Sequence, residues 1–482
     1  MAHLEVKRWK FMKRLETKSG PCPRLQSSIM KNDLLVLAAV LAGCLVGPPV
    51  CQAADDKANQ FPPQLFEFSV AKEQQVRTMA SDLDVPITSE IRDFFAAARI
   101  GDYTVLSNIV AKLAPEYEAS YRSPKEKLPA WIPFWPPMTE VESAYESFAR
   151  GGRRFPMDFG QGIIQSIPAG SIYFGGTDSG RMVVTALCES HAQGKPFYTL
   201  TQNALSDGRY EDYLRAMYGK EIYIPTTNDT QRAMEEYKAD AGLRYRQGRL
   251  KPGEDVRVVD GQVQFNGAVS VMAIHELIVK VILEHNPKRR FFLEESYPME
   301  TIYPYLSPHG LIFELHHTAL TNLTAEALDA DHQFWTREGG RLVGGWLKPD
   351  MSVSNVCAFA DTVYGRKDLS SLNADNEYVT NRFAMGAFSK LRVAIAGLYA
   401  WRSANESSSA DQGRLKAEAD FAFRQAFALC PTNPEVVFRY VDFLLAQSRN
   451  DDALVLVGTA QKLAPEDERY SRLLLRLRSM RP

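Results

Sequence analysis

The residues after one short apolar run carry the first candidate chemistry. The run is SIYFGG (171–176), and Thr177, Asp178 and Arg181 follow it at the start of a predicted helix. Free N–H groups at a helix start, with an arginine one turn in, suit a phosphate or carboxylate ligand. Thr177 or Asp178 can instead cap the helix with its own side chain. The pattern predicts a structural cap first, with ligand binding by these three residues as the alternative.

Polar side chains also follow two other predicted strands. Asn203 comes after the strand at 195–202, and Glu294 and Glu295 lie at the end of the strand at 289–296. Ligands of open α/β sheets bind beyond the carboxyl ends of the strands, so we expect these side chains and the first candidates at one rim. A carboxylate pair there could serve glycoside hydrolysis. Ion pairs that stabilise the rim are the favoured interpretation.

No cofactor and no metal are predicted. The glycine-rich turn matches neither the dinucleotide pattern G-x-G-x-x-G nor the Walker A loop. His316 and His317 are adjacent on a predicted strand and point to opposite faces, so they cannot hold one ion from there. The other residues considered as metal ligands are Asp329, Asp331 and His332. No G-x-S-x-G elbow or Cys/His nucleophile pattern is found.

Strands and helices alternate between residues 167 and 317, which predicts an α/β fold. Strands are expected at 171–176, 195–202, 221–225, 289–296 and 310–317, and helices at 179–194, 207–219, 270–286 and 298–306. Asp260-Gly261 is the turn of an attached hairpin. Such alternation predicts parallel pairing with right-handed crossovers. We therefore predict a Rossmann-like layered domain with a mostly parallel sheet.

Two features precede this domain. Residues 84–119 have the apolar spacing of two helices. The segment LPAWIPFWPPM (128–138) has four prolines and three aromatic residues, which predicts an extended strap whose aromatic rings pack on the protein. Carbohydrate stacking by Trp131 and Trp135 is the alternative.

The first 53 residues are organised like an export signal with a basic leader: a basic segment is followed by an apolar core and then by small residues. The apolar core of roughly 14 residues is shorter than the ~20 that span a bilayer. Cleavage after Ala53 predicts a soluble exported protein. Leu41-Ala42-Gly43-Cys44 resembles a bacterial lipobox, which predicts a lipid on Cys44 instead, and an uncleaved anchor is the third alternative. Translation starts at Met1 or Met30.

Composition excludes other classes of partner. The 482 residues are 45% hydrophobic and 24% charged, with a formal net charge of −2. This balance is typical of globular protein and predicts no nucleic-acid partner. No stretch after residue 53 has the length and apolar character of a membrane span, so any membrane attachment is expected through the N-terminus only.

Cys188, Cys357 and Cys430 are expected as buried small residues.

The C-terminal part contains a repeat with a period of 34 residues. Pro431 and Pro465 are 34 residues apart. The positions that match when both helices are counted back from these prolines are Ala419 with Ala453, Ala426 with Ala460, and Phe423 with Val457. Small residues at such places let two helices cross closely, and the period is that of tetratricopeptide (TPR) repeats. Two such hairpins are too few to fold as a solenoid, so they must pack on the rest of the chain.

The segments IPAGSIYFGGTDSGRMV, YTLTQNAL and NPKRRFFLEESYPMETIYPYLSPHGLIFEL carry a resemblance. They are similar to the soluble C-terminal region of bacterial protein O-mannosyltransferase-like membrane proteins of unknown function, which also continue into TPR-like helices. The similarity covers roughly Ile167 to the C-terminus. The family's multi-span membrane half, where glycosyl transfer would occur, has no counterpart here. The resemblance implies an envelope protein related to glycan transfer, not a transferase.

The sequence predicts five segments and two alternative functions. The segments are an export signal (1–53), a helical hairpin with the strap (54–138), the α/β domain (139–318), a helical connector (319–385) and TPR-like helices (386–482). The favoured function is a non-catalytic module of the periplasm or cell envelope, which binds a protein through its TPR helices and is associated with a glycan. The alternative is an enzyme of envelope glycan processing that acts at the strand-end rim.

Overall fold

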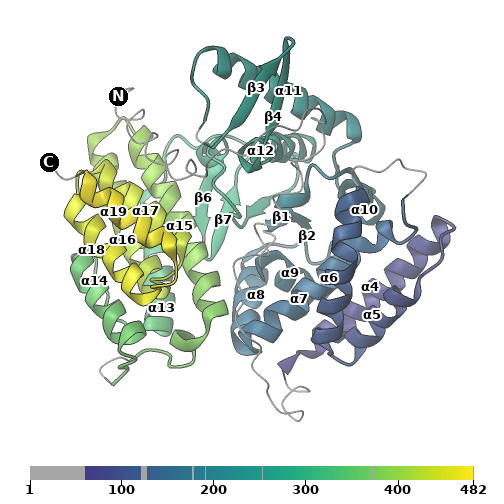
Figure 1. Ribbon diagram of the computed structural model, residues 1–482, viewed down its shortest axis with the longest axis horizontal. Coiled ribbons are helices and arrows are strands. Elements are labelled where there is room, and N and C mark those ends of the chain that lie inside the picture. The colour runs from purple at the N-terminus through teal and green to yellow at the C-terminus, as the bar shows by residue number, and fades with distance from the viewer. Residues whose placement is uncertain are drawn as a thin grey trace, which may run out of the picture. The chain divides into compact units, whose positions relative to one another are not determined.

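The computed structural model describes residues 60–120, 128–175, 179–189, 191–251, 253–370 and 373–480, without the side chains of residues 179–181 (Figure 1). The predicted export signal, Thr177, Asp178 and the side chain of Arg181 therefore lie outside the described part. The described residues fall into two compact units, 60–289 and 290–480. None of the described helices is both long enough and apolar enough to cross a membrane.

The first unit begins with a helical layer. Its helices are α4 (Pro63–Asp82), α5 (Ser89–Arg99), α6 (Tyr103–Ser120), η2 (Ile132–Phe134), α7 (Trp135–Gly151), α8 (Arg154–Ser166) and α9 (Ser179–Leu187). The two helices expected at 84–119 are confirmed as α5 and α6. The sequence pattern does not indicate α4, because the buried stripe of this helix includes Ser69 and Lys72 among the apolar residues. A stripe with polar members lacks the clean helical periodicity that marks an amphipathic helix.

Lys72 is buried because two neighbouring helices supply partners for its charge. Its ammonium pairs with the carboxylate of Glu140 on α7 and contacts the hydroxyl of Tyr213 on α10 (Gly208–Tyr218). The Tyr213 hydroxyl also donates to Glu140 Oε2 at 2.8 Å. A buried charge is tolerated only when it is paired and hydrogen-bonded. This cluster therefore ties α4 to two other helices of the same unit.

The predicted extended strap is wrong from Ile132 onward, because η2 covers residues 132–134 and is followed directly by Trp135. Helix α7 starts at that residue, and Pro136 and Pro137 occupy its first turn. Proline is tolerated there because the first N–H groups of a helix have no intrahelical acceptor. The predicted packing role of the aromatic rings is confirmed. Trp131 is buried, and Trp135 stacks on Tyr117 with 4.7 Å between ring centroids.

The remaining part of the first unit combines helices with two pairs of strands. Its elements are β1 (Ile172–Gly175), η3 (His191–Gln193), β2 (Tyr198–Thr201), η4 (Gln202–Ala204), α10 (Gly208–Tyr218), α11 (Thr227–Arg246), β3 (Asp255–Val259), β4 (Gln262–Asn266) and α12 (Ala268–His285). Strands β1 and β2 pair in parallel, with Ile172 opposite Tyr198. The hairpin of β3 and β4 is confirmed, with φ values of 51° at Asp260 and 76° at Gly261, as a turn with two left-handed residues requires.

The strand expected at 221–225 does not form. The side-chain amide of Asn286 takes the place of a neighbouring strand at Tyr223. Its Oδ1 accepts from the Tyr223 N–H at 2.8 Å, and its Nδ2 donates to the Tyr223 carbonyl at 3.1 Å. The backbone polar groups of a buried segment need partners, and here a side chain satisfies them.

The second unit begins with three antiparallel strands, β5 (Phe291–Leu293), β6 (Leu306–His309) and β7 (Ile312–Leu315), in the order β5-β7-β6. The helix expected at 298–306 is replaced by turns and η5 (Tyr303–Tyr305). Of the strand pairs described, one is parallel and three are antiparallel. These pairs therefore confirm strands among helices but not the predicted mostly parallel sheet.

Helices make up the rest of the second unit (Figure 1). They are α13 (Ala325–Val343), α14 (Val353–Ala360), η6 (Asp361–Gly365), η7 (Tyr378–Thr380), α15 (Arg382–Asn405), α16 (Ser409–Leu429), α17 (Pro434–Ala446), α18 (Asn450–Leu463) and α19 (Glu468–Ser479). Consecutive helices from α15 to α19 pack on one another. All the alanines that the 34-residue period aligns are fully buried, so small residues lie at the helix crossings as predicted.

Buried arginines join these hairpins to the remainder of the same unit. Arg402 of α15 donates to the carbonyl oxygens of Leu320 (2.9 Å), Tyr303 (3.1 Å) and Pro304 (2.7 Å). Arg424 of α16 donates in the same way to carbonyl groups at 348–351. The hairpins thus use residues outside the repeat to satisfy buried charges.

Candidate functional site

The first unit contains one part of the expected strand-end rim, which is the carboxyl end of β2. Thr201 ends the strand, and its N–H donates to the hydroxyl of Tyr210 at 2.7 Å. Gln202 follows as a fully buried residue, and Asn203 is half-buried. Asn203 is thus the one predicted site residue whose side chain is described in this unit. Glu294 and Glu295 belong to the other unit.

A serine and a histidine meet just beyond this strand end. Ser206 Oγ lies 2.8 Å from Nε2 of His275, which is fully buried on α12. No sequence pattern indicates this pair, because 69 residues separate its members. Burial lowers the pKa of His275 to about 3, so the imidazole stays neutral at physiological pH. A general base works best with a pKa near the working pH. The geometry therefore supports a hydrogen bond between the η4 region and α12 better than an activated serine.

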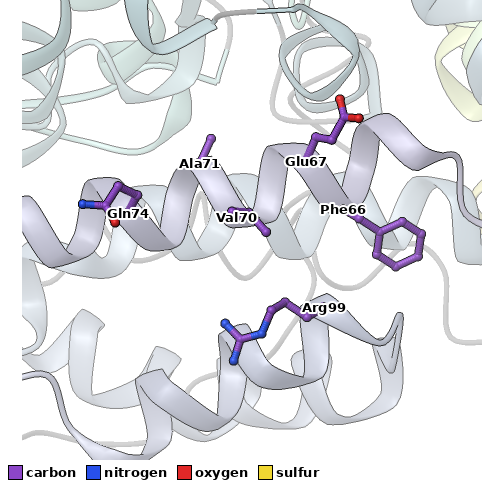
Figure 2. Close-up of a pocket in the computed structure, with 6 residues that line it drawn as sticks. All are labelled: Phe66, Glu67, Val70, Ala71, Gln74 and Arg99. Atoms are coloured by element: carbon purple, nitrogen blue, oxygen red, sulfur yellow. The ribbon is translucent and has the colours of Figure 1, made fainter.

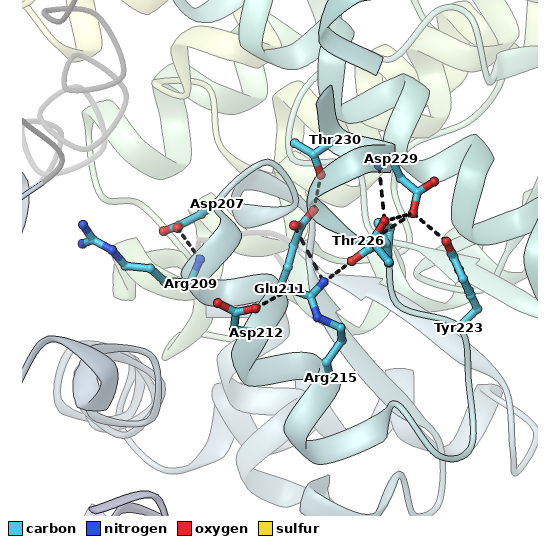
Figure 3. Close-up of polar contacts among 10 residues, drawn as sticks. Asp207, Arg209, Glu211, Asp212, Arg215, Tyr223, Thr226, Asp229 and Thr230 are labelled. Atoms are coloured by element: carbon cyan, nitrogen blue, oxygen red, sulfur yellow. Dashed lines mark hydrogen bonds and ion pairs between the residues drawn. The ribbon is translucent and has the colours of Figure 1, made fainter. Parts of the chain in front are cut away.

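Glu211 is the most deeply buried acidic group beside this strand end (Figure 3). Only 1% of its surface is exposed, and Oε1 accepts from the hydroxyl of Thr230 on α11 at 2.5 Å. Its Oε2 lies 3.9 Å from the guanidinium of Arg215. Burial raises the pKa of Glu211 to about 7 despite these two groups. The carboxyl group therefore links α10 to α11 and changes its charge close to neutral pH.

The start of α11 completes this polar cluster (Figure 3). Thr226 and Asp229 form a reciprocal capping box, and the Tyr223 hydroxyl donates to Asp229 Oδ2 at 2.5 Å. Burial alone would raise the pKa of Asp229, but the hydrogen bonds from Thr226 and Tyr223 lower it well below its usual range. Every carboxylate oxygen in this cap has a local donor. The cap is therefore a structural feature.

Glu295 is held in an ion pair, as the favoured interpretation of the rim predicts. Its Oε1 pairs with Arg439 of α17 at 2.7 Å, and its Oε2 accepts from the Tyr303 hydroxyl at 2.7 Å. Burial and the Glu295 charge raise the pKa of Tyr303 well above its usual value. Glu294 is also buried, at 3% exposure. The Glu295 carboxylate therefore anchors the end of β5 to the hairpins.

The residues considered as metal ligands have separate partners. His316 contacts Ser307 Oγ at 2.8 Å, and His332 pairs with Glu418 at 2.9 Å. Asp331 pairs with Arg392 at 2.8 Å, and Asp329 pairs with Arg414 at 2.9 Å. Within the described ranges, no three His, Cys, Asp or Glu side chains are grouped as metal ligands.

A surface pocket lies between α4 and α5 (Figure 2). Its volume is about 660 Å³, and its lining residues are Phe66, Glu67, Val70, Ala71, Gln74 and Arg99. Arg99 forms an ion pair with Glu73, so its guanidinium is already paired. Val70 is 52% exposed. The pocket offers an apolar contact surface that sequence analysis did not single out, because α4 itself was not predicted.

Aromatic stacking joins the C-terminal hairpins across the repeat. Phe423 of α16 stacks on Tyr440 of α17 at 5.1 Å between centroids, and Phe438 of α17 lies 6.4 Å from Tyr470 of α19. Helix α17 therefore contacts the hairpin before it through α16 and the next repeat through α19, as stacked repeats do.

Comparison with known proteins bears on this last region. The chain matches no curated protein and no solved structure. A family model described as tetratricopeptide repeat matches residues 416–477, which run from within α16 into α19. The C-terminal helices of this chain therefore contain TPR repeats.

Proposed function

We propose that this chain is a protein-interaction module that binds a partner protein through its C-terminal helical hairpins. The TPR match at 416–477 carries the proposal. Stacked TPR hairpins form extended surfaces that other proteins bind. The buried arginines fix these hairpins to the remainder of their unit, which supports a rigid docking surface.

The proposal includes a location and a second class of ligand. The export plan of residues 1–53 supports a protein of the periplasm or cell envelope. It is either soluble after cleavage at Ala53 or attached as a lipoprotein through Cys44. The resemblance to O-mannosyltransferase-like proteins supports an association with glycans, which the predicted Rossmann-like domain would dock.

The alternative, an enzyme of glycan processing, needs a group that exchanges protons near neutral pH in reach of a substrate. Glu295 is paired with Arg439, and His275 is neutral and fully buried. Glu211 has a suitable pKa of about 7 but is 1% exposed. These three groups therefore favour binding over catalysis.

Site-specific photocrosslinking in the native host tests the interaction. A photoreactive amino acid replaces Val455, which is 41% exposed on α18, or Ala446, which is exposed on α17. The control position is Leu243, which is 48% exposed on α11 of the other unit. We expect one discrete protein adduct from the first two positions and none from the control. No adduct from either hairpin position, or the same adduct from Leu243, would contradict the proposal.

A further inference from the structure

Helix α19 occupies the place of α17 one repeat later. Helix α17 starts at Pro434 and α19 at Glu468, which are 34 residues apart. The period therefore aligns Val441 of α17 with Leu475 of α19. Val441 is 1% exposed, whereas Leu475 is 66% exposed. An apolar position that is covered in one repeat is thus open in the next.

The covered stripe of α17 faces its hairpin partner α18. Val437, Val441 and Leu444 lie on one side of α17 by helical spacing, and all are buried. Tyr440 beside them faces α16, and Phe438 on another side faces α19. Helix α17 also packs on α18. The stripe of Val437, Val441 and Leu444 lies between the side of α17 that faces α16 and the side that faces α19, so this stripe is the contact with α18. The equivalent face of α19 consists of Ser471, Leu475 and Arg478.

This face of α19 is open from the α18 side as well. Gln461 of α18 donates to Ser471 Oγ at 2.9 Å, which places the two helices in register. Gly458 lies one turn before Gln461, and a Cβ there would meet no atom within 4 Å. Helices α18 and α19 are joined by a short loop and run antiparallel. Counting from the Gln461–Ser471 contact, Gly458 of α18 therefore lies at about the same height along the helix pair as Leu475 of α19. A side chain from outside would therefore find open space on α18 at the level of the exposed leucine.

Positive charge surrounds Leu475. Helix α19 contains four arginines and one glutamate. Arg472 and Arg478 lie three residues to either side of Leu475, so they flank it on the same face. The ion pair of Arg472 with Glu468 has side chains that are 54% and 83% exposed, and such pairs contribute little in water. We call Ser471, Arg472, Leu475 and Arg478 the α19 patch.

We infer that a helix of an acidic partner protein docks on the α19 patch, in the position that α18 takes on α17. The repeat defines the shape of the occupant, and the arginines define its charge. A second copy related by two-fold symmetry would bring two basic patches together, which is unfavourable. A membrane would need a wide apolar face, but Leu473, Leu474 and Leu477 are buried. The inference rests on the proposed protein-interaction function.

Helix α18 itself provides a probe. A fluorescein-labelled peptide of residues 450–463 has the apolar face that packs on α17. In an antiparallel arrangement, its acidic first turn, with Asp451 and Asp452, would lie near Arg478. The control peptide has Asp451→Lys and Asp452→Lys. Binding to the full chain is measured by fluorescence anisotropy at low and high salt.

We expect the full chain to bind the acidic peptide, more weakly at high salt, and to bind the control peptide less well. Leu475→Ala and the double variant Arg472→Glu/Arg478→Glu should each weaken binding by about tenfold or more. Two matched controls should stay within about twofold of the wild type. These are Arg382→Glu, at an exposed arginine of α15, and Leu243→Ala, at an exposed leucine of α11.

Three results would overturn the inference. The first is no peptide binding, or binding that the α19 variants leave unchanged. The second is co-sedimentation with phosphatidylglycerol vesicles that the α19 variants abolish, without peptide binding, which identifies a membrane. The third is a concentration-dependent dimer that Leu475→Ala abolishes, which identifies a second copy. If photocrosslinks from Val455 and Ala446 persist in these cases, the proposed function stands and only the α19 patch fails.

Discussion

Gly397 of α15 leaves the space in which the guanidinium of Arg439 of α17 lies. A Cβ at residue 397 would overlap that guanidinium. Arg439 in turn donates to Glu295 Oε1 at 2.7 Å and to the Tyr303 hydroxyl at 3.3 Å. The missing side chain at 397 therefore permits an ion pair between the end of β5 and a TPR helix. Close approach, not an unusual backbone angle, requires this glycine.

Gly397→Ala should destabilise the protein by ~1–3 kcal/mol, because the added methyl group displaces the half-buried guanidinium of Arg439 from its carboxylate. The matched control is Gly386→Ala on the same helix, where a Cβ meets no atom within 4 Å. Alanine there should stabilise the helix by ~0.5–1 kcal/mol. Urea unfolding of both variants measures the difference. Equal stabilities would contradict the packing described for Arg439.

Asp331→Ala should cost ~3–5 kcal/mol of unfolding free energy, because it leaves Arg392 buried without its carboxylate. Both side chains are almost fully buried, and the Tyr399 hydroxyl also donates to Asp331 at 2.7 Å. Asp329 lies on the same helix but forms an ion pair in which its side chain is 65% exposed. Asp329→Ala should therefore cost less than ~1 kcal/mol. Chemical denaturation would refute this account if the two losses were similar.

The raised pKa of Glu211 predicts a pH dependence of stability. The usual carboxyl pKa is 4.5, and burial raises it to about 7 in the folded protein. Between these values the folded state binds the proton and the unfolded state does not, so stability falls as pH rises from 4.5 to about 7. The difference is up to about 3 kcal/mol. Glu211→Gln should reduce the slope of this part of the stability–pH profile relative to the wild type.

The control for this profile is Asp212→Asn, because the Asp212 side chain is 76% exposed. Its profile should keep the wild-type slope between pH 4.5 and about 7. Denaturant midpoints across this range measure both variants. A Glu211→Gln profile that parallels the wild type would show that Glu211 ionises normally.

Residues 383–482 expressed alone should be poorly folded. The fragment lacks the carbonyl groups of Tyr303, Pro304 and Leu320 that bind Arg402, and it lacks Asp331, which pairs with Arg392. Two hairpins also cannot cover their own apolar faces. Residues 290–482, which include these partners, should unfold cooperatively. Thermal unfolding followed by circular dichroism distinguishes them, and a cooperative transition of the shorter fragment would disprove the dependence.

Cys44→Ser should leave export intact if cleavage follows Ala53. Metabolic labelling with a fatty-acid analogue then gives no label on the wild type or on the variant. Label on the wild type that disappears in Cys44→Ser would establish the lipoprotein alternative instead.

Local patterns in the sequence determined the elements whose formation depends on near neighbours. The Asp260-Gly261 turn was predictable because two adjacent residues adopt left-handed φ values. The TPR helices were predictable because the period places alanines such as Ala419 and Ala453 at helix crossings, where both are fully buried. The parallel pairing of β1 and β2 followed from the helix between them.

Only the tertiary structure decided which distant residues become partners. Arg439 and Glu295 are 144 residues apart, and Ser206 and His275 are 69 apart. Nothing near either member in the sequence identifies the other. Helix α4 was not predicted because Lys72 interrupts its apolar stripe. This lysine is buried only through its pairing with Glu140, which is far away in the chain. The antiparallel pairing of β5, β6 and β7 likewise depends on strand order, because a short apolar run has the same pattern in either direction.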